Sequence, residues 1–187
     1  MRKLKLQMQI TVDGYVAGPQ GQLDWITFDM DERLLAFINE MIDTSDTILL
    51  GRKMTPGFVD YWEDVMGNPR GPEYPFAEKM VRTPKVVFSK TVDHMHGKNV
   101  RVENADLGEA VNRLKRQTGK DLIVYGGATF VSSLIDHGLI DELNLFMNPV
   151  AIADGMRIFH GRRPLELTRS TSYPCGVVVN AYRPLSA

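Results

Sequence analysis

Three short clusters of glycine, hydroxyl and basic residues could bind a phosphate or pyrophosphate group. Each follows a run of apolar residues, and the clusters are Gly51-Arg52-Lys53, Ser89-Lys90 and Gly126-Gly127-Ala128-Thr129. Glycine lets backbone N–H groups approach an anion closely, and lysine and arginine supply the opposite charge. Each cluster is a weak signal by itself, because a tight turn or a solvated basic pair can also account for it.

The elements that would position these clusters are buried strands followed by helices. Residues 122–125 are apolar or aromatic on both faces, and residues 128–137 repeat apolar side chains at helical spacing. Apolar runs at 47–50 and 85–88 predict two more strands, each ending at one of the other clusters. Because ligands bind at the carboxyl ends of strands in α/β sheets, we expect the three clusters to face one crevice. The glycine spacing matches neither a Rossmann fingerprint nor a P-loop.

The remaining pattern predicts an α/β fold with a largely parallel sheet and an antiparallel end. The other expected helices cover residues 31–43, 73–81 and 107–117. The other expected strands cover residues 3–12 and 99–102 and the stretch that follows residue 138 and ends at Pro149. A closing hairpin of residues 165–172 and 177–182 comes after them. Several prolines predict that the chain is irregular from residue 55 up to the helix at 73–81.

Composition limits the classes of function. The chain has 187 residues, which fits one domain over residues 1–187 with a sizeable core. Its net charge of -1 offers no basic field for nucleic acid or an anionic membrane. Cys175 is the single cysteine, so an internal disulfide is excluded and a reducing, cytoplasmic location is expected. No apolar run approaches the roughly 18 residues of a membrane span, and the amino terminus alternates like a strand, unlike a signal peptide.

Further candidate residues lie in the loop after the first strand and at the end of the strand at 122–125. Trp25 and Phe28 could cover a planar substrate, or they could pack at the base of the loop. Asp13, Asp29 and Tyr125 are weak candidates for supplying a proton, and Tyr125 could also contact substrate. Asp13 suits an Asp-Gly turn equally well, and Asp29 suits a helix cap.

Neither metal binding nor a cysteine nucleophile is expected. His94 and His96 are two residues apart, but no third ligand follows at a recognisable spacing. Cys175 lies in a turn with no general base beside it, so a structural role is expected.

Six segments in sequence order resemble the dihydrofolate reductase-like superfamily. They are Thr11-Val12-Asp13-Gly14, Ile48-Leu49-Leu50-Gly51-Arg52-Lys53, Val86-Val87-Phe88-Ser89-Lys90-Thr91, Val124-Tyr125-Gly126-Gly127-Ala128, Gly138-Leu139-Ile140-Asp141-Glu142-Leu143 and residues 149–159. Within this superfamily the chain is most similar to the bacterial group related to the reductase domain of the riboflavin-biosynthesis deaminase–reductase. The resemblance covers nearly the whole chain.

This resemblance implies a three-layer α/β/α fold, NADPH as hydride donor and a homodimer. The resemblance places Val16 and Ala17 near the nicotinamide and Gly51, Arg52 and Lys53 under the phosphates. It places Ser89 and Lys90, together with Arg52 or Lys53, at the 2′-phosphate. The residues implied at the pyrophosphate are Gly126, Gly127, Ala128 and Thr129. The implied activity is reduction of a small planar or cyclic substrate, pteridine-like or pyrimidine-like.

The chain departs from its relatives at three positions. Met54 replaces a threonine that many relatives carry, and Leu35 lies near the helix carboxylate of dihydrofolate reductase. Tyr125 replaces the glutamate usual in riboflavin reductases, and a neutral phenol differs chemically from a carboxylate. Two alternatives therefore stay open: an NADP(H)-binding module without turnover, and a structural or interaction domain.

Overall fold

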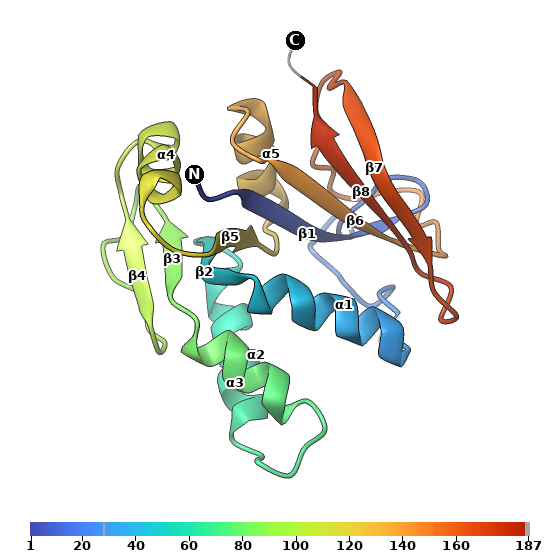
Figure 1. Cartoon of the computed structure of the whole chain (residues 1–187), viewed down its shortest axis with the longest axis horizontal. Helices are drawn as coiled ribbons and strands as arrows, with labels where there is room; N and C mark the ends of the chain where they lie inside the picture. Colours follow the sequence, from blue (N-terminus) through green and yellow to red (C-terminus); the bar gives the residue numbers. More distant parts are fainter. Residues whose placement is uncertain (28, 186–187) are drawn as a thin grey trace.

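The computed structural model describes residues 1–27 and 29–185, and strands from both ends of the chain lie in one sheet (Figure 1). Within the described residues the sheet has eight strands, in the order β4-β3-β2-β5-β1-β6-β8-β7. They are β1 (Leu4–Thr11), β2 (Ser45–Gly51), β3 (Lys85–Phe88), β4 (Val100–Glu103), β5 (Asp121–Val124), β6 (Glu142–Asn148), β7 (Leu165–Ser172) and β8 (Val178–Pro184). Strands β1 to β6 pair in parallel, and β8 and β7 add antiparallel at one edge. The predicted sheet and its closing hairpin are confirmed.

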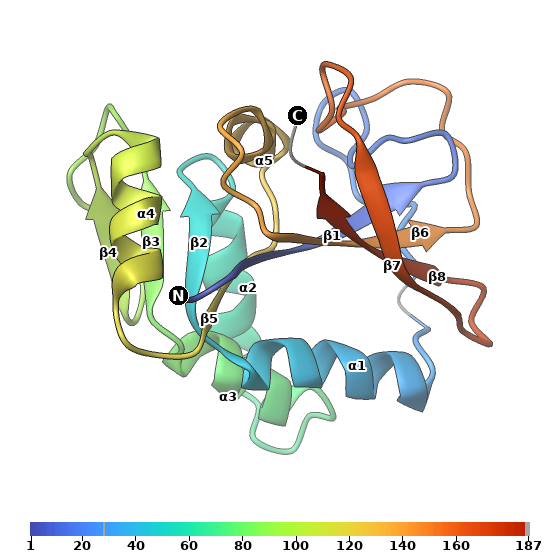
Figure 2. The same ribbon diagram turned by 45° about the horizontal axis from the view of Figure 1, so that its top comes forward.

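Helices cover both faces of the sheet. They are α1 (Glu32–Asp43), α2 (Thr55–Met66), α3 (Tyr74–Arg82), α4 (Leu107–Arg116) and α5 (Ala128–Asp136). Figure 2 shows α4 and α5 on one face and α1, α2 and α3 on the other, and a separate apolar cluster fills each layer. The expected three-layer α/β/α arrangement is confirmed. No helix in the described part of the chain has both the length and the apolar character needed to cross a membrane.

Helix α2 is the main difference from the sequence-based expectation. Residues 55–66 were expected to be irregular because the four prolines of this stretch, Pro56, Pro69, Pro72 and Pro75, break any long helix. Pro56 lies in the first turn of α2, where its missing N–H would have had no partner within the helix. The proline therefore starts this helix, and Val59 of its inner face is 1% exposed.

Strand β1 lies between β5 and β6, so helices cover both of its faces. One face is apolar and packs toward α4 and α5, with Leu4, Leu6, Met8 and Ile10. Its other face carries Lys5, Gln7 and Gln9 toward the α1 layer. Polar side chains of a central strand are therefore enclosed within the protein, and Gln7 is 8% exposed.

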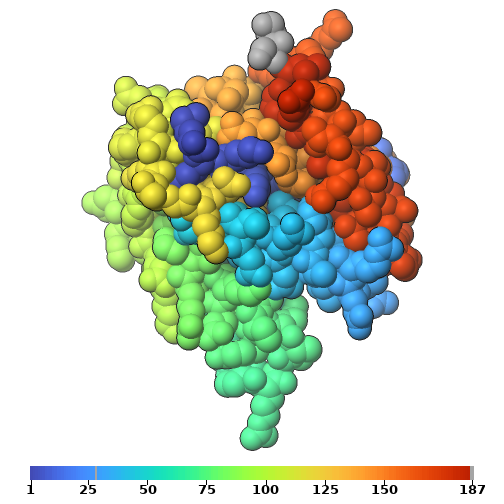
Figure 3. Space-filling model, viewed as in Figure 1, coloured from blue at the N-terminus to red at the C-terminus, as the bar shows by residue number. Residues whose placement is uncertain are grey.

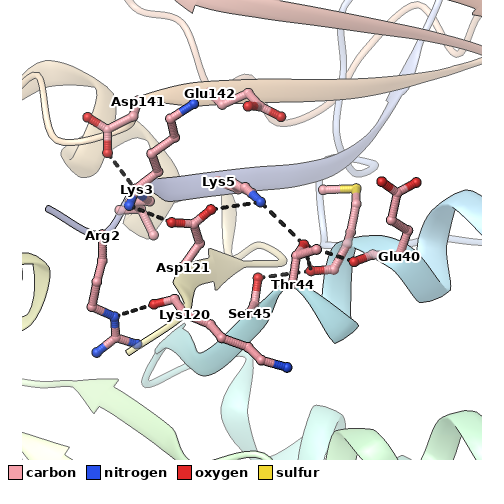
Figure 4. A network of polar contacts seen from close by, with 12 residues as sticks. Arg2, Lys3, Lys5, Glu40, Thr44, Ser45, Lys120, Asp121, Asp141 and Glu142 are labelled. Carbon is pink, nitrogen blue, oxygen red and sulfur yellow. Dashed lines mark hydrogen bonds and ion pairs between the residues drawn. The ribbon is translucent and has the colours of Figure 1, made fainter. Parts of the chain in front are cut away.

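Hydrogen bonds and ion pairs hold the amino end of β1 in register (Figure 4). The Asp121 carboxylate accepts from the backbone N–H of Lys3 at 2.8 Å and pairs with Lys5 Nζ at 2.8 Å. The Asp141 carboxylate accepts from the backbone N–H of Leu4 at 2.7 Å. These two carboxylates belong to the start of β5 and to the residue before β6, so they fasten β1 to both neighbours.

The first residues of the chain also dock against the end of α4. Figure 3 shows them in blue against the yellow segment, where the backbone N–H of Arg2 donates to the carbonyl of Lys115 at 3.0 Å. The Arg2 guanidinium contacts Asp46 at the start of β2. The Arg2 side chain therefore links the start of the chain to the start of β2 by a structural polar contact.

Candidate functional site

The three predicted phosphate-binding clusters lie at the same edge of the sheet. Gly51 at the end of β2 is opposite Phe88 of β3, and β2 also pairs with β5. Gly51 is therefore flanked by Ser89 on one side and by the Gly126–Gly127 turn on the other. The convergence predicted from the sequence is confirmed, and the ligand roles of these residues stay predictions.

The double-glycine turn connects β5 to α5 through a backbone conformation that other residues rarely adopt. Gly126 has φ 152° and Gly127 has φ 78°. Helix α5 begins at the next residue, Ala128, and no side chain of the described residues caps it. The N–H groups of its first turn, including that of Thr129, are therefore available to an anion at the positive end of the helix dipole.

A second uncapped helix start lies beside this turn. Met54 precedes α2 without forming a side-chain cap, and the Thr55 hydroxyl donates to the carbonyl of Gly51 at 3.0 Å. A Cβ added to Gly126 would lie 3.3 Å from Met54 Sδ, so the methionine packs against the turn. Two positive helix ends thus lie close together at the ends of adjacent strands, which favours an anionic group between them.

The basic side chains near this edge differ in how far they are already engaged. Arg52 and Lys53 are exposed at the end of β2. Lys90 Nζ donates to two backbone carbonyls just after β4, both at 2.8 Å. Ser89 Oγ accepts two backbone N–H groups of its own turn, both at 3.1 Å. Arg52 and Lys53 are therefore freer to contact a ligand than Ser89 and Lys90.

The loop after β1 is fastened to the segment after β6. The backbone N–H of Val16 donates to the carbonyl of Met156 at 2.9 Å, and the N–H of Met156 donates to the carbonyl of Ala17 at 2.8 Å. The side chains of Val16 and Ala17 are buried. Their predicted contact with a nicotinamide would therefore have to involve backbone atoms.

Asp13 organises this loop and is unsuited to donating a proton. It accepts from the Thr11 hydroxyl and from the backbone N–H groups of Ile152 and Ala153, at 3.1 and 2.8 Å. The hydrogen bond from Thr11, with further backbone hydrogen bonds, lowers the pKa of Asp13. The carboxyl group is thus ionised near neutral pH, and the turn-forming interpretation of Asp13 is favoured over the catalytic one.

The cap of α1 is Asp31, while Asp29 is exposed before it. Asp31 Oδ1 accepts from the backbone N–H groups of Arg33 and Leu34, at 3.0 and 3.2 Å. Burial raises the pKa of Asp31, but the hydrogen bond from Leu34 and others outweigh it and lower the pKa overall. Of the two aspartates that could have capped the helix, the structure selects Asp31.

Trp25 lines a small cleft in the loop region. The cleft has a volume of about 330 Å³, and its other lining residues are Gly18, Pro19, Gln22, Asp24, Ile152 and Asp154. The indole N–H of Trp25 donates to the carbonyl of Gln22 at 3.2 Å. Phe28, the other predicted aromatic of this loop, lies outside the described residues. A contact between Trp25 and substrate stays a prediction.

Tyr125 has a buried hydroxyl at the end of β5. Its ring lies 5.8 Å from the ring of Phe58 of α2, and its oxygen has no hydrogen-bond partner among the described residues. Burial raises the pKa of the Tyr125 phenol well above its ordinary value. Tyr125 therefore stays protonated at physiological pH, where it can donate a hydrogen bond but is a poor acid.

The family model of the RibD C-terminal domain matches residues 2–179. The chain belongs to this family. It is 31% identical over 186 residues to the uncharacterized protein YyaP of Bacillus subtilis (strain 168), with 97% of this chain and 94% of that protein covered. The resemblance to the riboflavin reductase group is thereby confirmed at the level of family.

Solved structures share the fold of this RibD C-terminal domain. A riboflavin biosynthesis protein from Shewanella sp. PV-4 superposes with a TM-score of 0.72 at 18% identity, covering 100% of both chains. The diaminohydroxyphosphoribosylaminopyrimidine deaminase/5-amino-6-(5-phosphoribosylamino)uracil reductase of Thermotoga maritima gives 0.68 at 17% identity, covering 98% of this chain and 57% of that one. Dihydrofolate reductase from Enterococcus faecalis, complexed with NADP(H), gives 0.62 at 16% identity, covering 98% and 97%. These likenesses establish the dihydrofolate reductase-like fold.

In this RibD C-terminal domain, the buried side of α1 carries no carboxylate. It consists of Leu34, Ile38, Met41 and Ile42, and Leu35 is 44% exposed. The acids at the start of this helix are the capping Asp31 and the exposed Glu32. An acid in the helix layer, as in dihydrofolate reductase, is therefore not available from α1.

A larger cavity than the one beside Trp25 lies at the opposite edge of the sheet. It has a volume of about 740 Å³ and is bordered by the end of α1, the end of α3 and the start of β5. Its charged groups already pair with one another, as Lys79 does with Asp43 and Arg82 with Glu78, both at 2.8 Å. We assign the candidate site to the other edge, because the free helix ends and glycine turns gather there.

A metal site is not built from the described residues. They contain no group of three or more histidine, cysteine, aspartate or glutamate side chains close enough to bind an ion. His96 instead contacts Asp60 of α2 at 2.7 Å. The thiol-bearing residue Cys175 packs against the α1 layer, and its backbone N–H lies 3.5 Å from Asp31 Oδ2.

Proposed function

We propose that the protein is an NADPH-dependent reductase of a small planar or cyclic substrate. The observation that carries this proposal is the meeting of two uncapped helix starts, those of α2 and α5, at the ends of neighbouring strands. Membership of the RibD C-terminal domain family supports it, as does the shared fold with uracil reductase and dihydrofolate reductase structures.

The chain's residues fit the phosphates of such a cofactor. Free N–H groups of the α5 start would contact the pyrophosphate, and the glycines before them leave room for it. The exposed side chains of Arg52 and Lys53 would favour the 2′-phosphate and therefore NADP(H) over NAD(H). Lys90 and Ser89 would play a smaller part, because local backbone groups already engage them.

In this proposal NADPH supplies a hydride, and the protein aligns substrate and cofactor while excluding water. Asp13 is held ionised, and Tyr125 holds its proton tightly. We therefore assign neither as general acid and propose that the substrate's proton comes from water. Tyr125 would contact the substrate through its ring edge and hydroxyl.

A binding module without turnover is the second candidate. Met54 occupies the position beside the double-glycine turn where many relatives have a threonine hydroxyl, and it packs its thioether there. An apolar side chain donates no hydrogen bond to phosphate, which would weaken cofactor binding. Tight NADPH binding without oxidation across a broad panel of cyclic substrates would favour this candidate.

The first experiment is a titration of the protein with NADPH and with NADH. Binding is measured by calorimetry and by the change in fluorescence of Trp25 and Trp62. We expect NADPH to bind at least about tenfold more tightly than NADH, a difference of roughly 1.4 kcal/mol. Arg52→Ala and Lys53→Ala should each reduce this preference. Arg116→Ala, which removes an exposed cation at the end of α4, is the matched control. The proposal fails if neither nucleotide binds at millimolar concentration.

Two further expectations accompany the proposal. We expect a cytoplasmic location, where NADPH would be available to the enzyme. We also expect a homodimer, because of the family resemblance. Edge strand β7 exposes Leu167 to 54%, which leaves an apolar side chain at the sheet edge. Analytical ultracentrifugation gives the oligomeric state directly.

A further inference from the structure

The thioether of Met54 lies between the two uncapped helix starts of the candidate site. Met54 directly precedes α2, and its sulfur lies 3.3 Å from the position that a Cβ on Gly126 would occupy. The Cβ of Met54 lies 3.8 Å from the corresponding position on Gly127, the residue before α5. The side chain therefore reaches from the start of α2 to the glycine turn after β5, where the cofactor pyrophosphate is proposed to bind.

A second thioether contacts the same turn but is shielded from solvent. The sulfur of Met8 in β1 lies 3.7 Å from the same Cβ position on Gly126, and Met8 is 5% exposed. Met54 is half-buried and packs against the apolar cluster on the α1 and α2 side of the sheet. Of these two methionines, Met54 is therefore the one that a small oxidant in solution can reach.

A partly exposed thioether can be oxidised by hydrogen peroxide to a sulfoxide. A lone pair of the sulfur attacks one peroxide oxygen, the O–O bond breaks, and the other oxygen leaves and is protonated to water. The sulfur loses two electrons and gains one oxygen atom, and the peroxide is reduced. The apolar side chain thereby becomes polar, and its new oxygen accepts hydrogen bonds but donates none.

The surroundings of Met54 favour such an acceptor. Among the described residues, no side chain caps the start of α2 or the start of α5. N–H groups in the first turns of both helices therefore lack acceptors, and both starts are the positive ends of helix dipoles. An oxygen on the Met54 sulfur carries partial negative charge beside these groups. A sulfoxide usually disrupts apolar packing, but at this position it supplies a missing helix cap.

The same oxygen competes with a bound phosphate. The N–H groups at the start of α5 are those proposed to contact the cofactor pyrophosphate. A sulfoxide oxygen that accepts from them leaves fewer donors for the ligand, and its partial negative charge repels phosphate. Oxidation of Met54 should therefore weaken cofactor binding and stabilise the cofactor-free protein. General oxidative damage differs, because it lowers both affinity and stability.

We propose that Met54 is an oxidation site, at which hydrogen peroxide forms a sulfoxide that caps the adjacent helix starts and blocks the cofactor phosphates. The loss of cofactor binding rests on the proposed reductase function, whereas the capping of the helices does not. Burial excludes Met8 from this role. Met66, which is also half-buried, lies at the opposite end of α2 and therefore away from the glycine turn.

The test treats the whole protein with hydrogen peroxide and then with dithiothreitol. The second step returns the single thiol, that of Cys175, to its reduced form and leaves sulfoxides in place. Peptide mass spectrometry gives the extent of oxidation of each methionine over time. We expect Met54 to be oxidised several-fold faster than the buried Met8. Saturation with NADP⁺ should slow the oxidation of Met54 and leave that of Met66 unchanged.

Two variants separate Met54 from the other methionines. Met54→Leu keeps an apolar side chain that cannot be oxidised, and Met66→Leu is the matched control on the same helix. Peroxide should weaken NADPH binding about tenfold in the wild type and in Met66→Leu, and should leave the affinity of Met54→Leu unchanged. The melting temperature after treatment should rise in the wild type relative to Met54→Leu, because only the wild type gains the cap.

Equal losses of NADPH affinity in the wild type and in Met54→Leu would overturn the inference, and so would a Met54 that stays unoxidised while Met66 is modified. A fall in melting temperature that requires Met54 would also overturn it, because the sulfoxide would then disturb packing without capping a helix. If the untreated protein does not bind NADPH, the reductase proposal fails. A rise in melting temperature that requires Met54 would still support the oxidation site in that case.

Discussion

A Cβ atom added to Gly51 would lie 2.7 Å from the Cβ of Phe130, closer than real side chains approach. Gly51 ends β2, and Phe130 lies in the first turn of α5, where its ring stacks on Phe88 with centroids 5.3 Å apart. The glycine therefore allows the start of α5 to lie directly over the end of β2. This close approach brings the two uncapped helix starts together.

Gly51→Ala should displace the start of α5 and destabilise the protein by about 1–3 kcal/mol, the usual cost of overpacking. Urea unfolding measures this loss, and NADPH titration measures the accompanying loss of affinity. Gly57→Ala in α2 is the control, because its added Cβ meets no described atom within 4 Å. An alanine in that helix should be neutral or stabilising by up to about 1 kcal/mol. Equal stability of the two variants would contradict the prediction.

Gly127→Ala tests the glycine turn itself. With φ 78°, the new side chain costs about 1–2 kcal/mol of backbone strain, although its Cβ would meet Phe130 Cβ at an ordinary 3.6 Å. Gly138→Ala is the matched control, since Gly138 has φ 63° and open space around it, after the end of α5. Both variants should lose similar stability, but only Gly127→Ala should lose NADPH affinity. Equal effects on affinity would exclude the turn from the cofactor site.

The parts of the fold that were predicted correctly are those in which local pattern and burial agree. The apolar run before Gly126, the two glycines and the helical spacing after them match β5, the turn and α5. The convergence of the junctions followed from the parallel sheet alone. What could not be predicted is which polar groups are already engaged. Lys90 binds backbone carbonyls after β4 that only the tertiary structure brings to it, and Ser89 is engaged by N–H groups of its own turn.

The burial of Gln7 could not be predicted for a related reason. A strand that alternates apolar and polar residues usually has one face in water, so Gln7 gave no sign of being buried. The order of strands places β1 in the centre with α1 over its polar face. Helix α2 was missed because Pro56 was taken as a helix breaker, although a first-turn proline is compatible with a helix.

Lys85 should make stability increase with pH in the alkaline range. It is 2% exposed, and its ammonium donates to the carbonyls of Val81, Thr83 and Lys98, at 2.9, 2.9 and 3.3 Å. Burial lowers the pKa of Lys85 from 10.5 to about 8. Between these two values the unfolded chain binds the proton and the folded protein does not, so raising the pH favours folding.

The measurement is urea unfolding of the wild type and Lys85→Met at pH 7.5 and 9.5. The stability of the wild type relative to the variant should rise by on the order of 1–2 kcal/mol over this interval. Lys98→Met, which replaces an exposed lysine, is the control. Its free energy of unfolding should change with pH by the same amount as that of the wild type. A constant difference between the wild type and Lys85→Met would contradict the lowered pKa.

Asp121 should contribute stability that is lost in acid. Burial raises the pKa of its carboxyl group, but the hydrogen bonds from Lys5 and Lys3 and the charges of these lysines outweigh this and lower the pKa below 3.8. Because this pKa is lowered, the contribution of Asp121 to stability is complete above the pKa of the unfolded state and disappears as the pH falls through the pKa of the folded state.

Asp121→Asn should therefore cost about 1 kcal/mol of stability at pH 7, since the pair is partly exposed, and progressively less below about pH 4. Asp93→Asn, at an exposed aspartate, is the control. Urea unfolding from pH 7 to pH 3 checks this, and a cost for Asp121→Asn that does not shrink in acid would mean that Asp121 stabilises β1 through hydrogen-bond geometry without its charge.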